Sequence, residues 1–157
     1  MLLDFGVETD EFGVSLQLSD ATLFDKLRIN VIDFGFASRY IDKKTKKHVK
    51  KTKLDMFKGN IDFASLNQLE FKRTSRRDDL ISLLYIMIYL FNNGKTINQA
   101  QNLKNQDAPS RLLLFKDIRK NQPLIELCSG TTANLLQFGE EVFSYGFSDK
   151  PNYDKLK

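Results

Sequence analysis

The sequence is almost without cysteine, with Cys128 alone among 157 residues. A single cysteine excludes an internal disulfide, so the composition favours a reducing compartment and an intracellular location, either cytoplasmic or nuclear. We expect Cys128 itself to be a small core residue. Histidine occurs once, at position 48, and tryptophan is absent. Since no ligand partners lie at suitable spacing from His48, the sequence predicts no metal site around it.

Long apolar runs are also lacking. The longest, Leu83–Phe91, is much shorter than the roughly 20 residues that cross a bilayer, so no transmembrane segment is expected. Early acidic residues (Asp4, Glu8 and Asp10) argue against a signal peptide. A length of 157 residues with 41% hydrophobic and 28% charged residues predicts one soluble, globular domain.

The net charge of +4 is modest, and its distribution is uneven. Alone it is too small to indicate nucleic-acid binding, so the partners we expect are a protein substrate or another protein. Seven lysines lie between Lys43 and Lys53. Two interpretations remain open for them: a solvated flexible loop, or a basic surface that attracts acidic or phosphorylated segments.

The pattern of apolar residues predicts a mainly helical fold with a small β element. The firmest prediction is a buried helix over 78–91, because its apolar side chains cover nearly the whole circumference. Ser75 is the expected N-cap, Asp78 lies in the first turn, and Asn92–Gly94 ends the helix. Further helices are expected over 110–119, 123–128 and 132–145, a strand over 29–32, and an exposed loop over 42–58. Residues 1–28 resemble the end of a strand followed by a loop or insertion, and 96–108 a surface connection.

The triplet Asp33-Phe34-Gly35 directly follows the predicted strand. A carboxylate at the end of a strand could hold Mg²⁺ beside the phosphates of ATP, and Gly35 would permit the backbone turn. On the triplet alone, an ordinary turn at the end of a strand is the favoured explanation. A second triplet, Asp4-Phe5-Gly6, has no matching partners downstream, and we interpret it as a coincidence.

The strings that follow Asp33 favour the first interpretation. Gly59 lies 24 residues after Gly35, and Phe63-Ala64-Ser65-Leu66-Asn67 and Ser75-Arg76-Arg77-Asp78-Asp79-Leu80 come next. In this order the chain resembles the casein kinase I family of Ser/Thr protein kinases, from Ile29 to about Leu156. The resemblance implies a mainly α (α+β) fold, the kinase-like large lobe with a short β element at its N-terminal end and no small lobe. Residues 29–157 would form a partial kinase domain, with an activation segment over 33–67 and C-terminal helices over 110–145.

The resemblance also implies roles for individual residues. ATP and Mg²⁺ would be the cofactors, with Asp33 as the metal ligand and Asp33 and Ile32 beside the nucleotide. Gly35, Gly59 and Asp79 would be structural, Asp79 as a buried acceptor for the backbone of the catalytic loop. The positions in the activation segment that would face a substrate are His48, Lys50, Lys51, Asn60 and Asp62.

The chain departs from the family in two respects. No residue before Asp33 supplies a glycine-rich phosphate loop, an ATP-pairing lysine or a catalytic-loop aspartate, so no catalytic residue is assigned. We therefore expect the 157 residues alone to transfer no phosphate and to bind ATP weakly or not at all. Without a catalytic loop, the Asp79 carboxylate must be exposed, paired locally or destabilising. Ser38, Asp55 and Asp62 stand where the family tends to have basic residues, which argues against recognition of phosphorylated substrates.

Two functions are therefore considered. The first is a casein-kinase-I-like Ser/Thr kinase represented by a C-terminal part, and the second is a non-catalytic binding or scaffold module derived from a kinase. The intact Asp33 favours the first. The substitutions at Asp55, Asn60 (where the family usually has Thr) and Asp62 favour the second.

Overall fold

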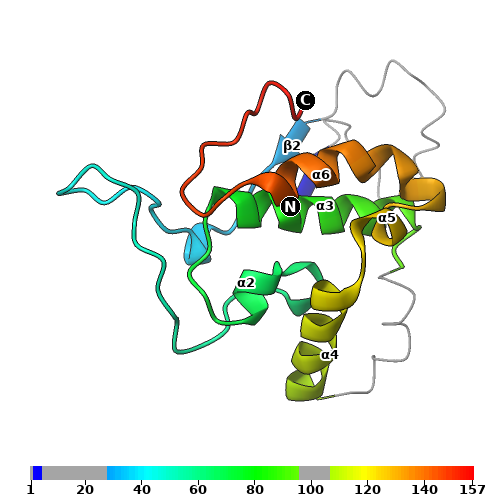
Figure 1. Cartoon of the computed structure of the whole chain (residues 1–157), viewed down its shortest axis with the longest axis horizontal. Coiled ribbons are helices and arrows are strands. Elements are labelled where there is room, and N and C mark those ends of the chain that lie inside the picture. Colours follow the sequence, from blue (N-terminus) through cyan, green and yellow to red (C-terminus); the bar gives the residue numbers. More distant parts are fainter. Residues whose placement is uncertain (1, 5–27, 96–106) are drawn as a thin grey trace, which may run out of the picture. The chain divides into compact units, whose positions relative to one another are not determined.

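The computed structural model describes residues 2–4, 28–95 and 107–157 (Figure 1). Two compact units are present, Met1–Ala37 and Ser38–Lys157, and each is described by itself. The described part is mainly helical, as the sequence predicts. The predicted loop or insertion after the first strand and most of the predicted surface connection over 96–108 lie outside the described residues.

The first unit contains a two-stranded antiparallel sheet. Strand β1 (Leu2–Asp4) pairs with β2 (Arg28–Asn30), and Leu2 lies opposite Asn30. The predicted strand over 29–32 therefore begins one residue earlier and ends two residues earlier than expected, because pairing with β1 stops at Asn30. A short 3₁₀ turn, η1 (Phe34–Phe36), follows.

The second unit is a set of helices. In chain order they are η2 (Ile61–Phe63), α2 (Leu66–Leu69), α3 (Arg76–Phe91), α4 (Ala108–Asn121), α5 (Leu124–Leu127), η4 (Gly130–Leu135) and α6 (Leu136–Ser144). Helix α4 begins before Pro109 because the Asp107 side chain accepts a hydrogen bond from the Ser110 amide and caps the helix there. The helix predicted over 132–145 is divided into η4 and α6. No helix that the structure describes is long and apolar enough to cross a membrane.

Helix α3 carries the largest core cluster. Its buried residues pack against α5, η4 and α6, and the cluster comprises Ile81, Leu84, Tyr85, Ile88, Leu127, Cys128, Leu135 and Val142. A smaller cluster joins Ala64 and Leu69 to Phe115 of α4. The prediction that α3 is buried on all sides is wrong, since Leu83, Leu90 and Phe91 are 38%, 56% and 47% exposed. The described helices that contact α3 cover only part of its circumference.

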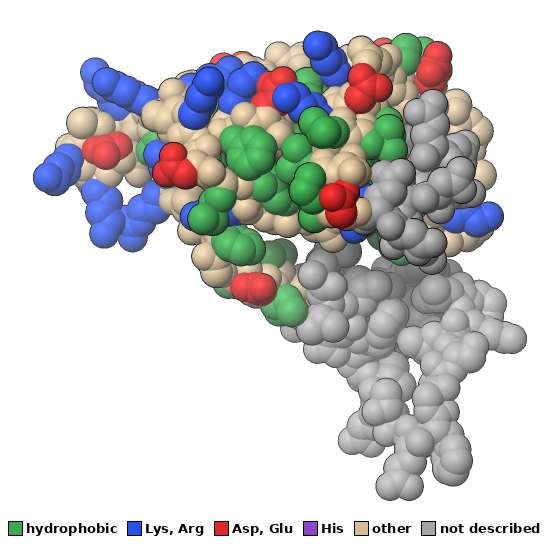
Figure 2. Space-filling view, turned by 90° about the horizontal axis from the view of Figure 1, so that it is seen from below, with side chains coloured by type: hydrophobic (Ala, Val, Ile, Leu, Met, Phe, Trp, Pro, Cys, Tyr) green, Lys and Arg blue, Asp and Glu red, His purple; other side chains and the backbone are tan. Residues whose placement is uncertain are grey.

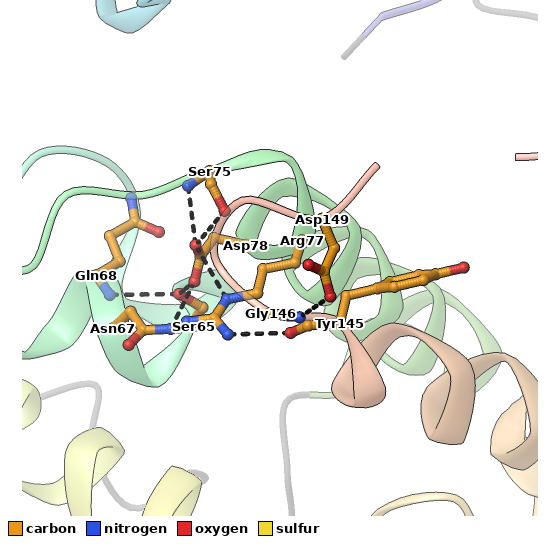
Figure 3. Close-up of polar contacts among 9 residues, drawn as sticks. All are labelled: Ser65, Asn67, Gln68, Ser75, Arg77, Asp78, Tyr145, Gly146 and Asp149. Atoms are coloured by element: carbon orange, nitrogen blue, oxygen red, sulfur yellow. Dashed lines mark hydrogen bonds and ion pairs between the residues drawn. The ribbon is translucent and has the colours of Figure 1, made fainter. Parts of the chain in front are cut away.

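The N-terminus of α3 is organised by one buried carboxylate. Ser75 is the N-cap, as predicted, and forms a capping box with Asp78, which is 1% exposed. Asp78 Oδ2 accepts a hydrogen bond from the Ser75 amide at 2.9 Å, and Oδ1 accepts from Ser65 Oγ at 2.8 Å and from Asn67 Nδ2 at 3.0 Å (Figure 3). The guanidinium of Arg77 lies 3.8 Å from Asp78 Oδ2 and donates to the Tyr145 carbonyl at 3.0 Å. These contacts join η2–α2, the start of α3 and the end of α6.

The loop predicted over 42–58 is exposed along most of its length. Asp42 Oδ1 accepts hydrogen bonds from the amides of Lys44 and Thr45, which forms a tight turn, and a β-bridge between Ile41 and His48 closes it. These local bonds give the lysine-rich tip a defined base although few of its side chains are covered.

The two adjacent aspartates of α3 should differ sharply in their effect on stability. Asp78→Ala leaves donors from Ser65, Asn67 and Ser75 without their acceptor, so we expect a loss of about 3 kcal/mol in the free energy of unfolding. Asp79→Ala, at an exposed position, should change it by less than about 0.5 kcal/mol. Urea unfolding followed by circular dichroism measures both variants, and equal losses would contradict this account.

Candidate functional site

The predicted nucleotide and metal residues lie in the first unit. Asp33 follows strand β2 as the N-cap of η1, with φ 60° and ψ 74°, and its Oδ1 accepts a hydrogen bond from the Gly35 amide at 3.2 Å. The residue of this turn with a left-handed backbone is Asp33, and Gly35 has no positive φ. An aspartate tolerates this conformation when its carboxylate bonds the nearby backbone. A Cβ on Gly35 would lie 3.1 Å from Asp33 Oδ1, so glycine leaves room for that bond.

Ile32 and Asp33 are both exposed, Ile32 by 46%. Among residues 2–4, 28–95 and 107–157 no group of three or more His, Cys, Asp and Glu side chains could hold a metal ion. Asp33 is thus one exposed carboxylate, without further carboxylate, imidazole or thiolate ligands grouped around it among these residues. A magnesium ion that binds with a nucleotide takes most of its remaining ligands from phosphate and water, so one carboxylate is compatible with that chemistry but does not form a site alone.

The end of the predicted activation segment holds three residues singled out from the sequence: Gly59, Asn60 and Asp62. Gly59 has φ +123°, and a Cβ there would come within 2.4 Å of Gln68 Nε2, which donates to the Lys58 carbonyl. Asn60 caps η2 by accepting a hydrogen bond from the Asp62 amide at 2.9 Å. The φ of Gly59 strains any other residue there, and the cap on η2 gives Asn60 a structural reason for its identity.

The charge of the Asp62 carboxylate is balanced by Arg111 of α4. Its carboxylate receives a hydrogen bond from Arg111 Nη2 at 2.6 Å, and its main-chain carbonyl accepts from Arg119 Nη2 at 2.7 Å. The sequence interpretation treated Asp62 as a free negative charge that repels phosphate. The structure instead gives it a structural ion pair between η2 and α4, so its repulsion of an anion is reduced.

His48 has a packing role. Its ring meets that of Phe147 edge-on at 4.9 Å between centroids, and lies 6.0 Å from the ring of Tyr40. Nδ1–H donates to the Val49 carbonyl at 2.9 Å. These contacts fix the base of the lysine-rich loop to the C-terminal segment.

Lys50 and Lys51 are exposed, as are the other five lysines between positions 43 and 53. Figure 2 shows several Lys and Arg side chains projecting at the left of the view, with others along the upper edge. Asp42 and Asp55 flank the segment. The loop therefore presents a local excess of positive charge in solvent, which attracts anions but is screened by salt.

Asp79 is exposed, the first of the alternatives that the sequence left open. Protein atoms still crowd its carboxyl, and this desolvation, followed by the charge of adjacent Asp78, raises the pKa of Asp79 above its ordinary value. The buried acceptor at the start of α3 is Asp78. The capping-box spacing from Ser75 to Asp78 is the signal that identifies it.

Two arginines of α4 were missed by the sequence interpretation. Arg111 pairs with Asp62, and Arg119 lies over the ring of Tyr85 with 3.5 Å between its guanidinium carbon and the ring centroid. No motif marks them, because both partners are distant in sequence. Burial lowers the pKa of Arg119, and Tyr85 and Asp62 act in the opposite direction.

A search against models of protein families finds none that matches this chain. The function is therefore inferred from the residues and their geometry.

The raised pKa of Asp79 predicts a pH-dependent effect on stability. A carboxyl whose pKa is higher in the folded than in the unfolded state disfavours folding once it ionises, so stability falls as pH rises through that interval. Asp79→Asn should therefore raise the melting temperature at pH 7, and the gain should vanish below the ordinary pKa of 3.8. Thermal unfolding across pH tests this. Asp55→Asn, at an exposed loop position, is the control and should give no gain at either pH.

Proposed function

We propose that the chain is the large-lobe part of a casein-kinase-I-like Ser/Thr protein kinase, an enzyme that transfers the γ-phosphoryl group of ATP to a Ser or Thr hydroxyl. The observation that carries the proposal is a pair of hydrogen bonds. Ser65 and Asn67, from the string Phe63–Asn67, both donate to Asp78 in the string Ser75–Leu80. The two strings on which the resemblance depends are thus bonded to each other.

The ends of α3 add support. Its N-terminus begins at a capping box, and its C-terminus stops at Asn92, followed by Asn93 and Gly94 with φ of 53° and 74°. A well-defined helix whose N-terminus anchors the preceding segment is what a kinase large lobe requires. The exposed Asp79 is then available to accept hydrogen bonds from a catalytic loop that these 157 residues do not contain.

Asp33 has the role of magnesium ligand in this proposal. Bound Mg²⁺ would neutralise charge on the phosphates of ATP, and Asp33 would position it by one carboxylate. Positioning and electrostatics supply most of the catalysis of phosphoryl transfer, and one ligand provides only part of them. The chain alone should therefore show no transfer and weak or absent binding of Mg²⁺-ATP.

The proposal is tested most directly by adding the kinase elements that these residues lack. A casein kinase I small lobe and catalytic loop are fused before Met1, and transfer of labelled phosphate to a Ser-containing acidic peptide is measured. We expect the fusion to be active and Asp33→Ala to reduce its activity about a hundredfold or more, because a metal ligand is lost.

Asp154→Ala, which removes an exposed carboxylate outside the predicted activation segment, is the matched control and should leave the activity of the fusion unchanged. A folded fusion without activity would contradict the kinase proposal. So would an Asp33→Ala variant as active as its parent.

The second candidate is a non-catalytic module that binds an acidic segment of a partner protein. The specific observation in its favour is the exposed lysine-rich loop, together with the pairing of Asp62 by Arg111. Because Asp62 is paired with Arg111, it adds no unpaired negative charge to the surface that would meet an acidic ligand. The lysines act as point charges on flexible stems, so such binding should be weak and sensitive to salt.

This candidate predicts that the chain binds an oligo-glutamate peptide, measured by fluorescence anisotropy, and that binding weakens as salt rises. The double variant Lys50→Glu with Lys51→Glu should weaken it at least about tenfold, since two attractions become repulsions. The double variant Lys116→Glu with Lys120→Glu, an equal change of charge on α4, should have little effect. Equal losses from the loop and the α4 variants would show that only net charge matters.

A further inference from the structure

A cavity of about 210 Å³ lies among α3, α4, α5 and α6. Its apolar lining comes from Tyr85, Ile118, Leu124, Leu127 and Phe143. Phe143 is 46% exposed, so it stands at an opening to solvent. An apolar cavity of about 150 Å³ is large enough to hold benzene. This cavity therefore has room for one aromatic ring and a small polar group.

Arg119 brings a positive charge to this apolar space. It lines the cavity, and its Nη2 and Nε donate to the carbonyls of Asp62 and Ala64. Nη1 is enclosed and has no hydrogen-bond partner in the described part of the chain. A covered N–H group without an acceptor is costly, and a ligand that supplies one recovers that cost.

No carboxylate balances the charge of Arg119 directly. Among the described residues, no Asp or Glu oxygen lies within 4 Å of its nitrogens, and the carboxylate of Asp62 is bonded to Arg111 instead. A second space beside Arg119, near Phe63 and Tyr89, has a volume of only about 10 Å³ and holds at most one water. Only the larger cavity can admit an anion.

Gln122 supplies a second polar group at the same place. It lines the cavity, and its Oε1 is buried without a hydrogen-bond partner among the described residues. The terminal torsion of a glutamine turns easily, so its NH₂ group can be presented instead of the oxygen. Arg119 and Gln122 are three residues apart, at the end of α4 and just beyond it. Both can therefore donate to one carboxylate.

We propose that this cavity binds a small carboxylate whose apolar body is about one aromatic ring. The carboxylate accepts hydrogen bonds from Arg119 Nη1 and from the amide of Gln122. The apolar body packs against Leu124, Leu127 and Phe143. This site is independent of the proposed kinase function, because it uses neither Asp33 nor the lysine-rich loop.

Benzoate is the probe, titrated into the 157-residue chain and followed by calorimetry and by NMR shifts of the Leu127 methyl groups. We expect saturable binding with a Kd of about 1 mM or tighter. Benzyl alcohol, which keeps the ring but lacks the charge, should bind at least about tenfold more weakly. Absence of saturable benzoate binding, or equal binding of the alcohol, would overturn the proposal.

Substitutions locate the site. Arg119→Met should weaken benzoate binding at least about tenfold, whereas Lys120→Met, which removes the same charge from the next and exposed residue, should leave it unchanged. Leu124→Phe keeps Arg119 but fills the cavity, so it should also abolish binding. Melting curves show whether each variant folds. If Arg119→Met does not fold, the result for Leu124→Phe decides whether benzoate binds in this cavity. Benzoate binding to folded Arg119→Met or Leu124→Phe as tight as to the unchanged chain would overturn the site.

Discussion

The buried carboxylate of Asp78 is the constraint on which most of the second unit depends. A carboxylate that is 1% exposed is stable only if donors replace the water it has lost. Ser65, Asn67 and the Ser75 amide supply them. Ser65 and Asn67 lie at the start of α2 and Ser75 caps α3, so one acceptor fixes the starts of both helices relative to each other. Arg77 extends this linkage to the carbonyl of Tyr145 at the end of α6.

Arginines make several of the other long-range polar links among the described residues. Arg111 and Arg119 hold η2 against α4 through the side chain and main chain of Asp62, and Arg76 reaches the Ser148 carbonyl while its guanidinium lies over Tyr40. A guanidinium suits these places because it is planar, stacks on aromatic rings and donates in several directions at once. Seven lysines, by contrast, lie on the exposed loop between positions 43 and 53, where a charged ammonium group keeps its hydration.

Local signals predicted the helices well, and the failures arise where distant residues decide. The N-cap at Ser75 and the ends of α3 follow from caps and glycine chemistry within a few residues. The exposure of Leu83, Leu90 and Phe91 could not be predicted from periodicity, because the neighbours of α3 are set by the tertiary fold. The same holds for Asp62, whose partner Arg111 is 49 residues away, and for the cavity beside Arg119. At the turn after β2 the difference has a local cause. Asp33 and Gly35 can both adopt a left-handed backbone, and it is Asp33 that does so, with its carboxylate bonded to the Gly35 amide.

Two neighbouring aspartates show how position decides what a carboxylate can do. Asp78 and Asp79 both lie in the first turn of α3, where the helix dipole favours negative charge. The Asp78 carboxylate accepts hydrogen bonds from Ser65, Asn67 and the Ser75 amide, so both of its oxygens have partners. Asp79 faces outward, yet protein atoms and the charge of Asp78 raise its pKa, so its ionised form lacks the compensation that Asp78 enjoys. A group in that condition gains most from an added hydrogen-bond donor. This is why an exposed Asp79 supports rather than weakens the proposal that a catalytic loop of a kinase would dock at this end of α3.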